Sequence, residues 1–179
     1  MFVPGEETPV LGARALRLDT AETLVDGPVP HVADAAGSAR LAIDEGCPCF
    51  CAFCAESWDR KPYRTRSADT LVRLAREIKA AGAVEALEIF SMSFSSHPEL
   101  HRILAALAPR FHRLGLKSQR LDVLAHDPAA AASQHALGKS NLTCGIEGIS
   151  AHLRRRLHKS LGEDEIREGL AALLRARPR

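Results

Sequence analysis

Gly46-Cys47-Pro48-Cys49-Phe50-Cys51-Ala52-Phe53-Cys54 places four of the chain's five cysteines within eight positions. The run directly before it, residues 40–44, alternates polar and apolar side chains and predicts a short strand that enters a core. Thiols gathered on a loop after a strand indicate a metal or cluster site. This loop is the feature around which the rest of the chain is interpreted.

The cysteine spacing can be divided in two ways. Cys47-x3-Cys51-x2-Cys54 leaves Cys49 spare, whereas Cys49-x-Cys51-x2-Cys54 leaves Cys47 spare. An iron–sulfur cubane offers four irons, so three thiolates leave one iron without a protein ligand. A structural zinc site usually takes two ligand pairs separated by a long loop, and no second pair follows at such a distance. Disulfides would require an oxidising compartment, and nothing in the sequence suggests export.

The first spacing, with Phe53 just before the last cysteine, resembles the cysteine loop of the radical S-adenosylmethionine (radical SAM) superfamily. The resemblance implies that Cys47, Cys51 and Cys54 bind a [4Fe-4S] cluster and that Cys49 is not a ligand. In the family, S-adenosylmethionine chelates the open iron and is cleaved to methionine and a 5′-deoxyadenosyl radical by an electron from a donor such as flavodoxin or ferredoxin. Phe53 resembles the aromatic residue that lies against the adenine, although a hydrophobic anchor for the loop would also explain it.

A second resemblance lies in residues 145–160. Gly-Ile-Glu-Gly-Ile-Ser at 145–150, followed by His-Lys-Ser at 158–160, is similar to a segment of radical SAM enzymes related to the cobalamin-binding and methylthiotransferase branches. It implies that Glu147 and Lys159 contribute to cosubstrate binding, and it raises the expectation of cobalamin bound by a domain upstream of this sequence. Alone, Glu147 would more simply favour the amino end of the following helix.

The end of the expected second strand departs from the family pattern. The family places a glycine-rich turn there to receive the amino group of the cosubstrate, whereas this chain has Phe90-Ser91-Met92-Ser93. Ser91 and Ser93 can form the same hydrogen bonds and are candidate binding residues, but core or capping serines are equally consistent with the pattern. Arg120 could reach a carboxylate or pair with Asp122 on a strand surface.

Strands and helices are expected to alternate along the chain. Residues 1–37 are rich in Pro and Gly and predict an irregular lead-in, whereas 38–179 form the expected core domain. Strands are expected at 40–44, 84–92, 116–125 and 141–145. The expected helices lie between Ser67 and Gly82, from the Ser96-x-x-Glu99 capping box to Gly115, and at 127–138. A last helix carries Ile166, Leu170, Leu173 and Leu174 on one side.

Four alternating strand-helix units predict an α/β fold with a parallel sheet, whose functional groups gather at the carboxyl ends of the strands. The resemblance implies a partial TIM-type (β/α) barrel of the radical SAM core. Because the family core has six units, the resemblance also implies an open, truncated barrel with an unpaired edge at 141–145. Such a chain is expected to be incomplete as an enzyme, poorly active and prone to association.

Composition excludes several classes of protein. The 179 residues are 46% hydrophobic but only 4% aromatic, which predicts an aliphatic core. A net charge of +2, with both signs mixed along the chain, gives no indication of a nucleic-acid surface, and Arg154–Arg156 is expected to be a solvated helix face. No run reaches the ~18 apolar residues of a membrane span, so a cytoplasmic protein is expected. His97 and His101 have a zinc-compatible spacing, but Pro98 stands where the metalloprotease pattern has the glutamate that follows its first histidine.

The sequence therefore predicts a radical SAM enzyme that acts on a small molecule or peptide whose identity the sequence leaves open. A non-catalytic iron–sulfur or zinc-binding module, left by truncation, is the alternative.

Overall fold

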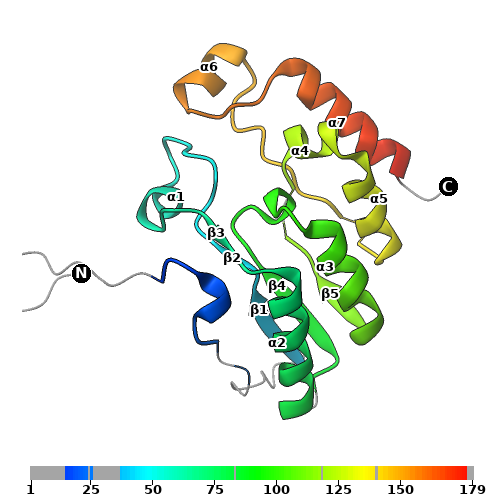
Figure 1. Cartoon of the computed structure of the whole chain (residues 1–179). Coiled ribbons are helices and arrows are strands. Elements are labelled where there is room, and N and C mark those ends of the chain that lie inside the picture. The colour runs from blue at the N-terminus through cyan, green and yellow to red at the C-terminus, as the bar shows by residue number, and fades with distance from the viewer. Residues whose placement is uncertain are drawn as a thin grey trace, which may run out of the picture.

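The computed structural model describes residues 15–23, 25, 37–82, 84–117, 119–139 and 141–176. Its main sheet contains three parallel strands, β1 (Ser38–Ala42), β4 (Ala86–Phe90) and β5 (Arg113–Gly115), in the order β1-β4-β5 (Figure 1). Parallel neighbours require crossover connections, and helices supply them here. The predicted α/β fold with a parallel sheet is confirmed, as an open sheet consistent with part of a barrel.

One face of the sheet is covered by α2 (Ala68–Ala81) and α3 (Leu100–Leu107), which lie side by side on it (Figure 1). The Ser67 hydroxyl accepts a hydrogen bond from the Thr70 amide and caps α2, as the sequence predicts. Apolar side chains then recur at helical spacing toward the sheet. The residues that fill this core include Leu41, Leu71, Leu74, Ile78, Leu87, Ile89, Leu100, Ile103, Leu104 and Leu107.

The other face of the sheet carries a different set of side chains. Arg40, Ala42 and Phe90 alternate with the buried residues of β1 and β4 and are exposed. Near the amino ends of the strands, Arg113 forms an ion pair of 3.0 Å with Glu88 across this face. Near the carboxyl ends, Ala42 and Phe90 form one wall of a pocket described below.

A small hairpin brackets the cysteine loop. Strand β2 (Asp44–Glu45) pairs antiparallel with β3 (Arg64–Thr65), and α1 (Ala55–Asp59) lies between them in the chain. The 3-10 helix η1 (Leu18–Thr20) docks beside β3, where Asp19 accepts a 2.8 Å hydrogen bond from the Ser67 amide. Part of the predicted irregular lead-in is therefore packed against the core, and residues 1–14 and 26–36 lie outside the described part.

The strand predicted at 116–125 is wrong, and so is the helix end predicted at Gly115. Gly115 is the last residue of β5, and residues 121–126 form helix α4 (Leu121–His126). The apolar residues of this short run fit a period of 2 or of 3.6 about equally well, so burial decides between them. Leu121 and Leu124 share the buried face of α4, which packs against α7 (Glu163–Ala176).

The capping box predicted at Ser96 and Glu99 does not form. Ser96 ends the 3-10 helix η2 (Phe94–Ser96), and its hydroxyl bonds that of Ser93 at 2.7 Å. The Glu99 carboxylate instead accepts a 2.9 Å hydrogen bond from the Ala68 amide at the start of α2. Glu99 thus stabilises the neighbouring helix, because the orphan amide of α2 lies within its reach. The predicted buried stripe behind it is confirmed: Leu100, Ile103, Leu104, Leu107 and Phe111 are all buried.

The carboxyl-terminal third contains α5 (Pro128–Ala136), α6 (Ala151–Arg156) and α7, and the 3-10 helix η3 (Ala108–Arg110) precedes β5. The predicted fourth strand is reduced to one parallel bridge between Gln119 and Cys144. Leu170 and Leu174, two of the four residues on the predicted apolar side of α7, are exposed. The small residues Gly169 and Ala172 face the core instead, because a Cβ at Gly169 would lie 2.5 Å from the Leu121 carbonyl oxygen.

Among the described residues, no helix combines the length and apolar character needed to cross a membrane.

Candidate functional site

The cysteine loop leaves the sheet at the carboxyl end of β1 and runs to α1 (Figure 1). Gly46, with φ +79°, permits the sharp turn, and a Cβ there would lie 2.5 Å from the Arg60 carbonyl oxygen. At its far end, the Trp58 indole donates a 3.0 Å hydrogen bond to the carbonyl of Cys51, and the Ser57 hydroxyl donates one of 3.0 Å to Cys54. The loop is therefore fixed by its own first helix.

The thiols of the loop lie in different environments. All are free; Cys51 is buried, whereas Cys47, Cys49 and Cys54 are partly buried. A hydrogen bond from the Cys49 side chain, assisted by the Arg120 charge, lowers the pKa of Cys47 to about 6, and the same interaction raises the pKa of Cys49. Burial raises the pKa of Cys51, an effect that the positive charge of Lys159 opposes. Of Cys47, Cys49 and Cys51, Cys47 is thus the thiol with the lowered pKa, and the Cys49 thiol is its hydrogen-bond donor.

Within the described ranges, no three Cys, His, Asp or Glu side chains are gathered closely enough to hold a single metal ion. A zinc site requires its ligands to converge on one point. The thiolates of a four-iron cluster bind separate irons and need not converge in that way. The four free thiols of the loop, whose pKa values respond to the charges of Arg120 and Lys159, are a donor set that fits an anionic cluster.

The segment predicted from the second resemblance meets the cysteine loop. The amide of Ala52 donates a 2.9 Å hydrogen bond to the carbonyl of Leu157, directly after α6. Lys159, whose side chain is only 11% exposed, places its Nζ 3.7 Å from Oε1 of Glu147. Glu147 has a positive φ of 66° and does not lie in α6, whose amino end is capped by the Ser150 hydroxyl. The structure thus brings Glu147, Lys159 and the cysteine loop together on one rim.

The prediction that residues 154–156 form a solvated helix face is wrong for Arg154. Its side chain is 1% exposed, whereas Arg155 and Arg156 are exposed as predicted. The guanidinium donates hydrogen bonds of 2.8 Å to Leu161, 2.9 Å to Gly148 and 2.8 Å to Ile149, all to carbonyl oxygens. Arg154 therefore links the backbone before α6, at Gly148 and Ile149, to the backbone after it, at Leu161. The sequence does not predict this burial, because Arg154 lies in a run of three arginines.

Ser91 and Ser93 lie behind the cysteine loop in a buried hydrogen-bond network. The Ser91 hydroxyl donates to Asp44 Oδ2 at 2.7 Å and accepts from the Ser93 amide at 3.0 Å. The Ser93 hydroxyl bonds Ser96 and also helps to lower the pKa of Cys47, which places it beside the loop. Both serines are thus near the predicted site, and protein partners already occupy part of their hydrogen-bonding capacity.

Asp44 is a site residue that the sequence prediction missed. It is 5% exposed, and burial raises its pKa to about 6, against the lowering effect of hydrogen bonds from Ser91, Tyr63 and the Met92 amide. Tyr63 donates to it from 3.3 Å, and burial together with this carboxylate raises the pKa of the phenol. The sequence does contain a signal for this residue, because Asp44 is a carboxylate at the end of a strand, directly before the cysteine loop.

The aromatic residues of the loop lie on its outer surface. Phe53 is 52% exposed, which rules against its being a buried anchor and leaves a face available to a ligand. Phe50 and Trp58 pack with ring centroids 5.2 Å apart, and the Lys61 ammonium lies over both rings. The scarce aromatic residues of this chain are therefore concentrated around the candidate site.

The two histidines considered for zinc have separate structural partners. His97 is buried and bonds the Arg66 carbonyl at 3.1 Å through Nε2, while its Nδ1 accepts from the Glu99 amide. Nε2 of His101 lies 2.6 Å from Oδ2 of Asp127.

Arg120 forms an ion pair of 2.6 Å with Asp122, as one alternative predicted. The pair lies at the start of helix α4 and not on a strand, and the charge of Arg120 also acts on the Cys47 thiol.

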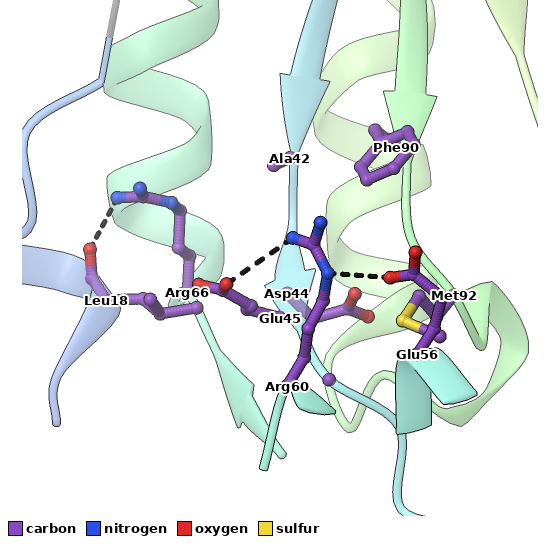
Figure 2. Close-up of a pocket in the computed structure, with 10 residues that line it drawn as sticks. Leu18, Ala42, Asp44, Glu45, Glu56, Arg60, Arg66, Phe90 and Met92 are labelled. Atoms are coloured by element: carbon purple, nitrogen blue, oxygen red, sulfur yellow. Dashed lines mark hydrogen bonds and ion pairs between the residues drawn. The ribbon is translucent and has the colours of Figure 1, made fainter. Parts of the chain in front are cut away.

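A pocket opens at the carboxyl ends of β1 and β4, beside the cysteine loop (Figure 2). Its volume is about 220 Å³. In Figure 2 the Arg60 side chain lies between Glu45 and Glu56, at 3.6 Å and 2.7 Å, while Arg66 turns to the Leu18 carbonyl. The pocket adjoins Asp44, Gly46 and Met92, and so shares residues with the loop and with the serine network.

Known proteins resemble this chain in sequence and in fold. Two ribosomal protein uS12 methylthiotransferases RimO are similar in sequence: that of Syntrophobacter fumaroxidans is 37% identical over 70 residues, 39% of this chain, and that of Symbiobacterium thermophilum is 30% identical over 104 residues, 54% of it. The matches span only 16% and 21% of those proteins. The structure of the cobalamin-dependent S-adenosylmethionine radical enzyme OxsB, with aqua-cobalamin and S-adenosylmethionine bound, matches 75% of this chain and 22% of its own, with a TM-score of 0.58 and 15% identity.

The family model described as the radical SAM superfamily matches residues 42–178, a range that contains the cysteine loop, the pocket strands and the Glu147 segment. The chain belongs to the radical SAM superfamily.

Proposed function

We propose that this chain binds a [4Fe-4S] cluster through Cys47, Cys51 and Cys54 and binds S-adenosylmethionine beside it. The observation that carries the proposal is the contact between the cysteine loop and the segment of Glu147 and Lys159, through the 2.9 Å hydrogen bond from Ala52 to Leu157. Residues predicted separately from two stretches of sequence thereby share one rim. When bound, the cluster supplies the electron for reductive cleavage of the sulfonium to a 5′-deoxyadenosyl radical.

The chain's own residues supply charge and orientation at this rim. Lys159 and Arg120 place positive charge near the thiols, which offsets the negative charge that thiolate ligands bring into a partly buried loop. The carboxylate of Glu147 is 38% exposed and can accept hydrogen bonds from ribose hydroxyls or from an amino group. Lys159 holds that carboxylate in place, and Arg154 holds the backbone on both sides of it.

Cys49 has a different role in this proposal. Its amide donates a hydrogen bond to Cys47 Sγ at 3.4 Å and so supports that sulfur, and we propose that the Cys49 thiol is not itself a ligand. A fourth thiolate would occupy the iron that S-adenosylmethionine requires. Ser91 and Ser93 are proposed to line the cosubstrate site from the end of β4, and Phe53 to lie against the adenine.

Binding of S-adenosylmethionine by the reconstituted chain tests the proposal. The full chain, reconstituted anaerobically with iron and sulfide, is expected to bind it and to form 5′-deoxyadenosine with dithionite as the reductant. An external donor such as flavodoxin or ferredoxin would supply the electron in the cell. Protein that takes up zinc but no sulfide, or that holds a cluster without binding S-adenosylmethionine, would instead support the non-catalytic module.

A further inference from the structure

Helix α6 carries a charged surface that the candidate site does not use. Residues 148–162 contain three arginines and one lysine but no acidic residue. Arg154 is buried and Lys159 is held in an ion pair, so neither adds to the charge of the outer surface. Arg155 and Arg156 are exposed, and no residue in the described ranges forms an ion pair with either of them. The outer surface of α6 therefore has uncompensated positive charge.

Two apolar side chains lie on the same surface. Ile149 is 97% exposed and Leu153 is 43% exposed. The Leu153 side chain lies against the turn that carries Ile149, because a Cβ on Gly148 would be 3.0 Å from Leu153 Cγ. Leu153 and Arg156 are three residues apart and so share one side of the helix. An apolar centre with a charged margin is the usual anatomy of a protein–protein interface.

The exposed isoleucine is carried by a well-supported backbone. From the buried side of α6, Arg154 donates hydrogen bonds of 2.9 Å to the carbonyl of Gly148 and 2.8 Å to that of Ile149. The Ser150 hydroxyl accepts a hydrogen bond of 3.1 Å from the Leu153 amide. A segment that is already ordered loses little conformational entropy when another molecule binds to it. The turn thus presents an apolar side chain to solvent in a fixed position.

This surface adjoins the cysteine loop, as Figure 1 shows for α6 and the loop before α1. The Leu157 carbonyl, directly after α6, accepts the 2.9 Å hydrogen bond from the Ala52 amide. A protein bound on α6 would therefore lie beside the loop that carries the proposed cluster ligands. Because electrons pass rapidly between proteins only over short distances, this position suits a partner that delivers an electron.

The size and charge of the surface favour one class of partner. Helix α6 has six residues and is about 9 Å long. Such a short face fits the small interfaces of transient electron-transfer complexes, which bury less than about 1,200 Å². A nucleic-acid interface that contacts about six to ten phosphates would need more cations than the two exposed arginines. Positive charge here instead speeds the encounter with an acidic protein.

We propose that Ile149, Leu153, Arg155 and Arg156 form the docking surface for an acidic electron-donor protein that carries a flavin or an iron–sulfur centre. In the docked complex the donor loses one electron and the cluster gains it, and no bond forms or breaks between the two proteins. The use of that electron rests on the proposed function, whereas docking of the acidic protein does not.

Binding of an acidic, oxidised flavodoxin to the full chain, measured by surface plasmon resonance at low salt, tests the charged part of the surface. Arg155→Glu combined with Arg156→Glu is expected to weaken binding at least ~tenfold. The difference should fall below about threefold in about 0.5 M salt, where exposed charges are screened. The matched control combines Arg76→Glu of α2 with Arg175→Glu of α7, which changes the net charge equally at exposed sites outside α6 and should alter the affinity less than about threefold.

Ile149→Ser tests the apolar part. It is expected to weaken flavodoxin binding at least ~threefold at both salt concentrations, because burial of an apolar side chain is not screened by salt. The control is Leu174→Ser, at a leucine of α7 that is 68% exposed, and it should bind flavodoxin as the parent does. Equal affinities of these two variants would remove Ile149 from the proposed surface and contradict the inference.

Reduction of the reconstituted chain tests the role of the partner. Reduced flavodoxin should reduce the cluster at least ~tenfold more slowly in the double arginine variant, by stopped-flow absorption, while excess dithionite still reduces it completely. An unchanged rate in that variant would overturn the donor assignment. Absence of flavodoxin binding to the parent, or tighter binding of a single-stranded RNA that the same variant loses, would overturn the docking surface. Flavodoxin binding through α6 to a chain that assembles no cluster would reject the proposed function and keep the docking surface.

Discussion

The backbone amide of Ala52, between Cys51 and Cys54, donates a 2.9 Å hydrogen bond to the carbonyl oxygen of Leu157. Two residues later in each segment lie Cys54 and Lys159, and Lys159 is paired with Glu147. Parallel strands deliver the loops at their carboxyl ends to a common edge. This backbone contact thus explains how the cysteine loop near the start of the core and the segment of Glu147 and Lys159 near its end come to lie together.

Serine substitutions are expected to separate the ligand cysteines from Cys49. Cys47→Ser, Cys51→Ser and Cys54→Ser should each remove most of the iron from the reconstituted chain, because a serine hydroxyl is a poor substitute for a soft thiolate. Cys49→Ser should retain iron near the parent level, since serine can still support Cys47. Iron and sulfide analysis measures this. Equal loss in all four variants would indicate a closed site with four thiolates.

Glu147→Gln is expected to weaken S-adenosylmethionine binding about tenfold or more, since a charge-assisted hydrogen bond contributes ~1.5–3 kcal/mol. The absorption spectrum of the cluster should stay unchanged, because Glu147 is not placed among the ligands. Equilibrium binding to the reconstituted chain measures the effect. Glu163→Gln, a change at an exposed residue of the first turn of α7, serves as the control and should bind as the parent does. Equal affinity of both variants for S-adenosylmethionine would show that Glu147 does not contribute to binding and has only a structural role in its turn.

Arg154→Met is expected to lower the free energy of unfolding by about 3 kcal/mol or more. The substitution leaves the carbonyls of Gly148, Ile149 and Leu161 without their donor in a part of the molecule where the arginine is 1% exposed. Urea unfolding measures the loss. Arg155→Met, at the exposed neighbour, should cost less than about 0.5 kcal/mol. Similar stabilities of the two variants would show that the buried hydrogen bonds contribute little.

Asp44 is expected to make the stability depend on pH. Its pKa of about 6 in the folded chain exceeds its usual value of 3.8, so the folded state binds more protons between those two values. Stability therefore falls as the pH rises from about 4 to above 6, by up to about 3 kcal/mol for this one group. Asp44→Asn should be more stable than the parent at pH 7.5 and equally stable near pH 4, by urea unfolding under reducing conditions. A constant difference at both pH values would contradict the assignment.

The sequence predicted the first half of the fold well because its signals are local and consistent. Ser67 precedes a strongly periodic apolar stripe, and the helix begins and ends where the cap and Gly82 indicate. After Gly115 the signals are short and compatible with either period. There α4 is decided by packing against α7, where Gly169 allows a backbone approach that no pattern of hydrophobic residues reveals.

The sequence predicted the candidate binding residues of the site but not the buried residues that hold them in place. Cys47, Cys51, Glu147 and Lys159 came from recognisable spacing, and the structure places them on one rim. Asp44 and Arg154 were missed, because polar residues carry no mark of burial in a sequence. Both act through hydrogen bonds to residues distant in the chain or across a turn, and only the folded arrangement supplies those partners.

The most direct test of the account is anaerobic reconstitution followed by iron and sulfide analysis and an assay for 5′-deoxyadenosine. We predict about four irons and four sulfides per chain, with 5′-deoxyadenosine formed from S-adenosylmethionine in the presence of dithionite and no such product from Cys51→Ser. Stoichiometric zinc without sulfide, or a complete cluster that yields no 5′-deoxyadenosine, would contradict the account.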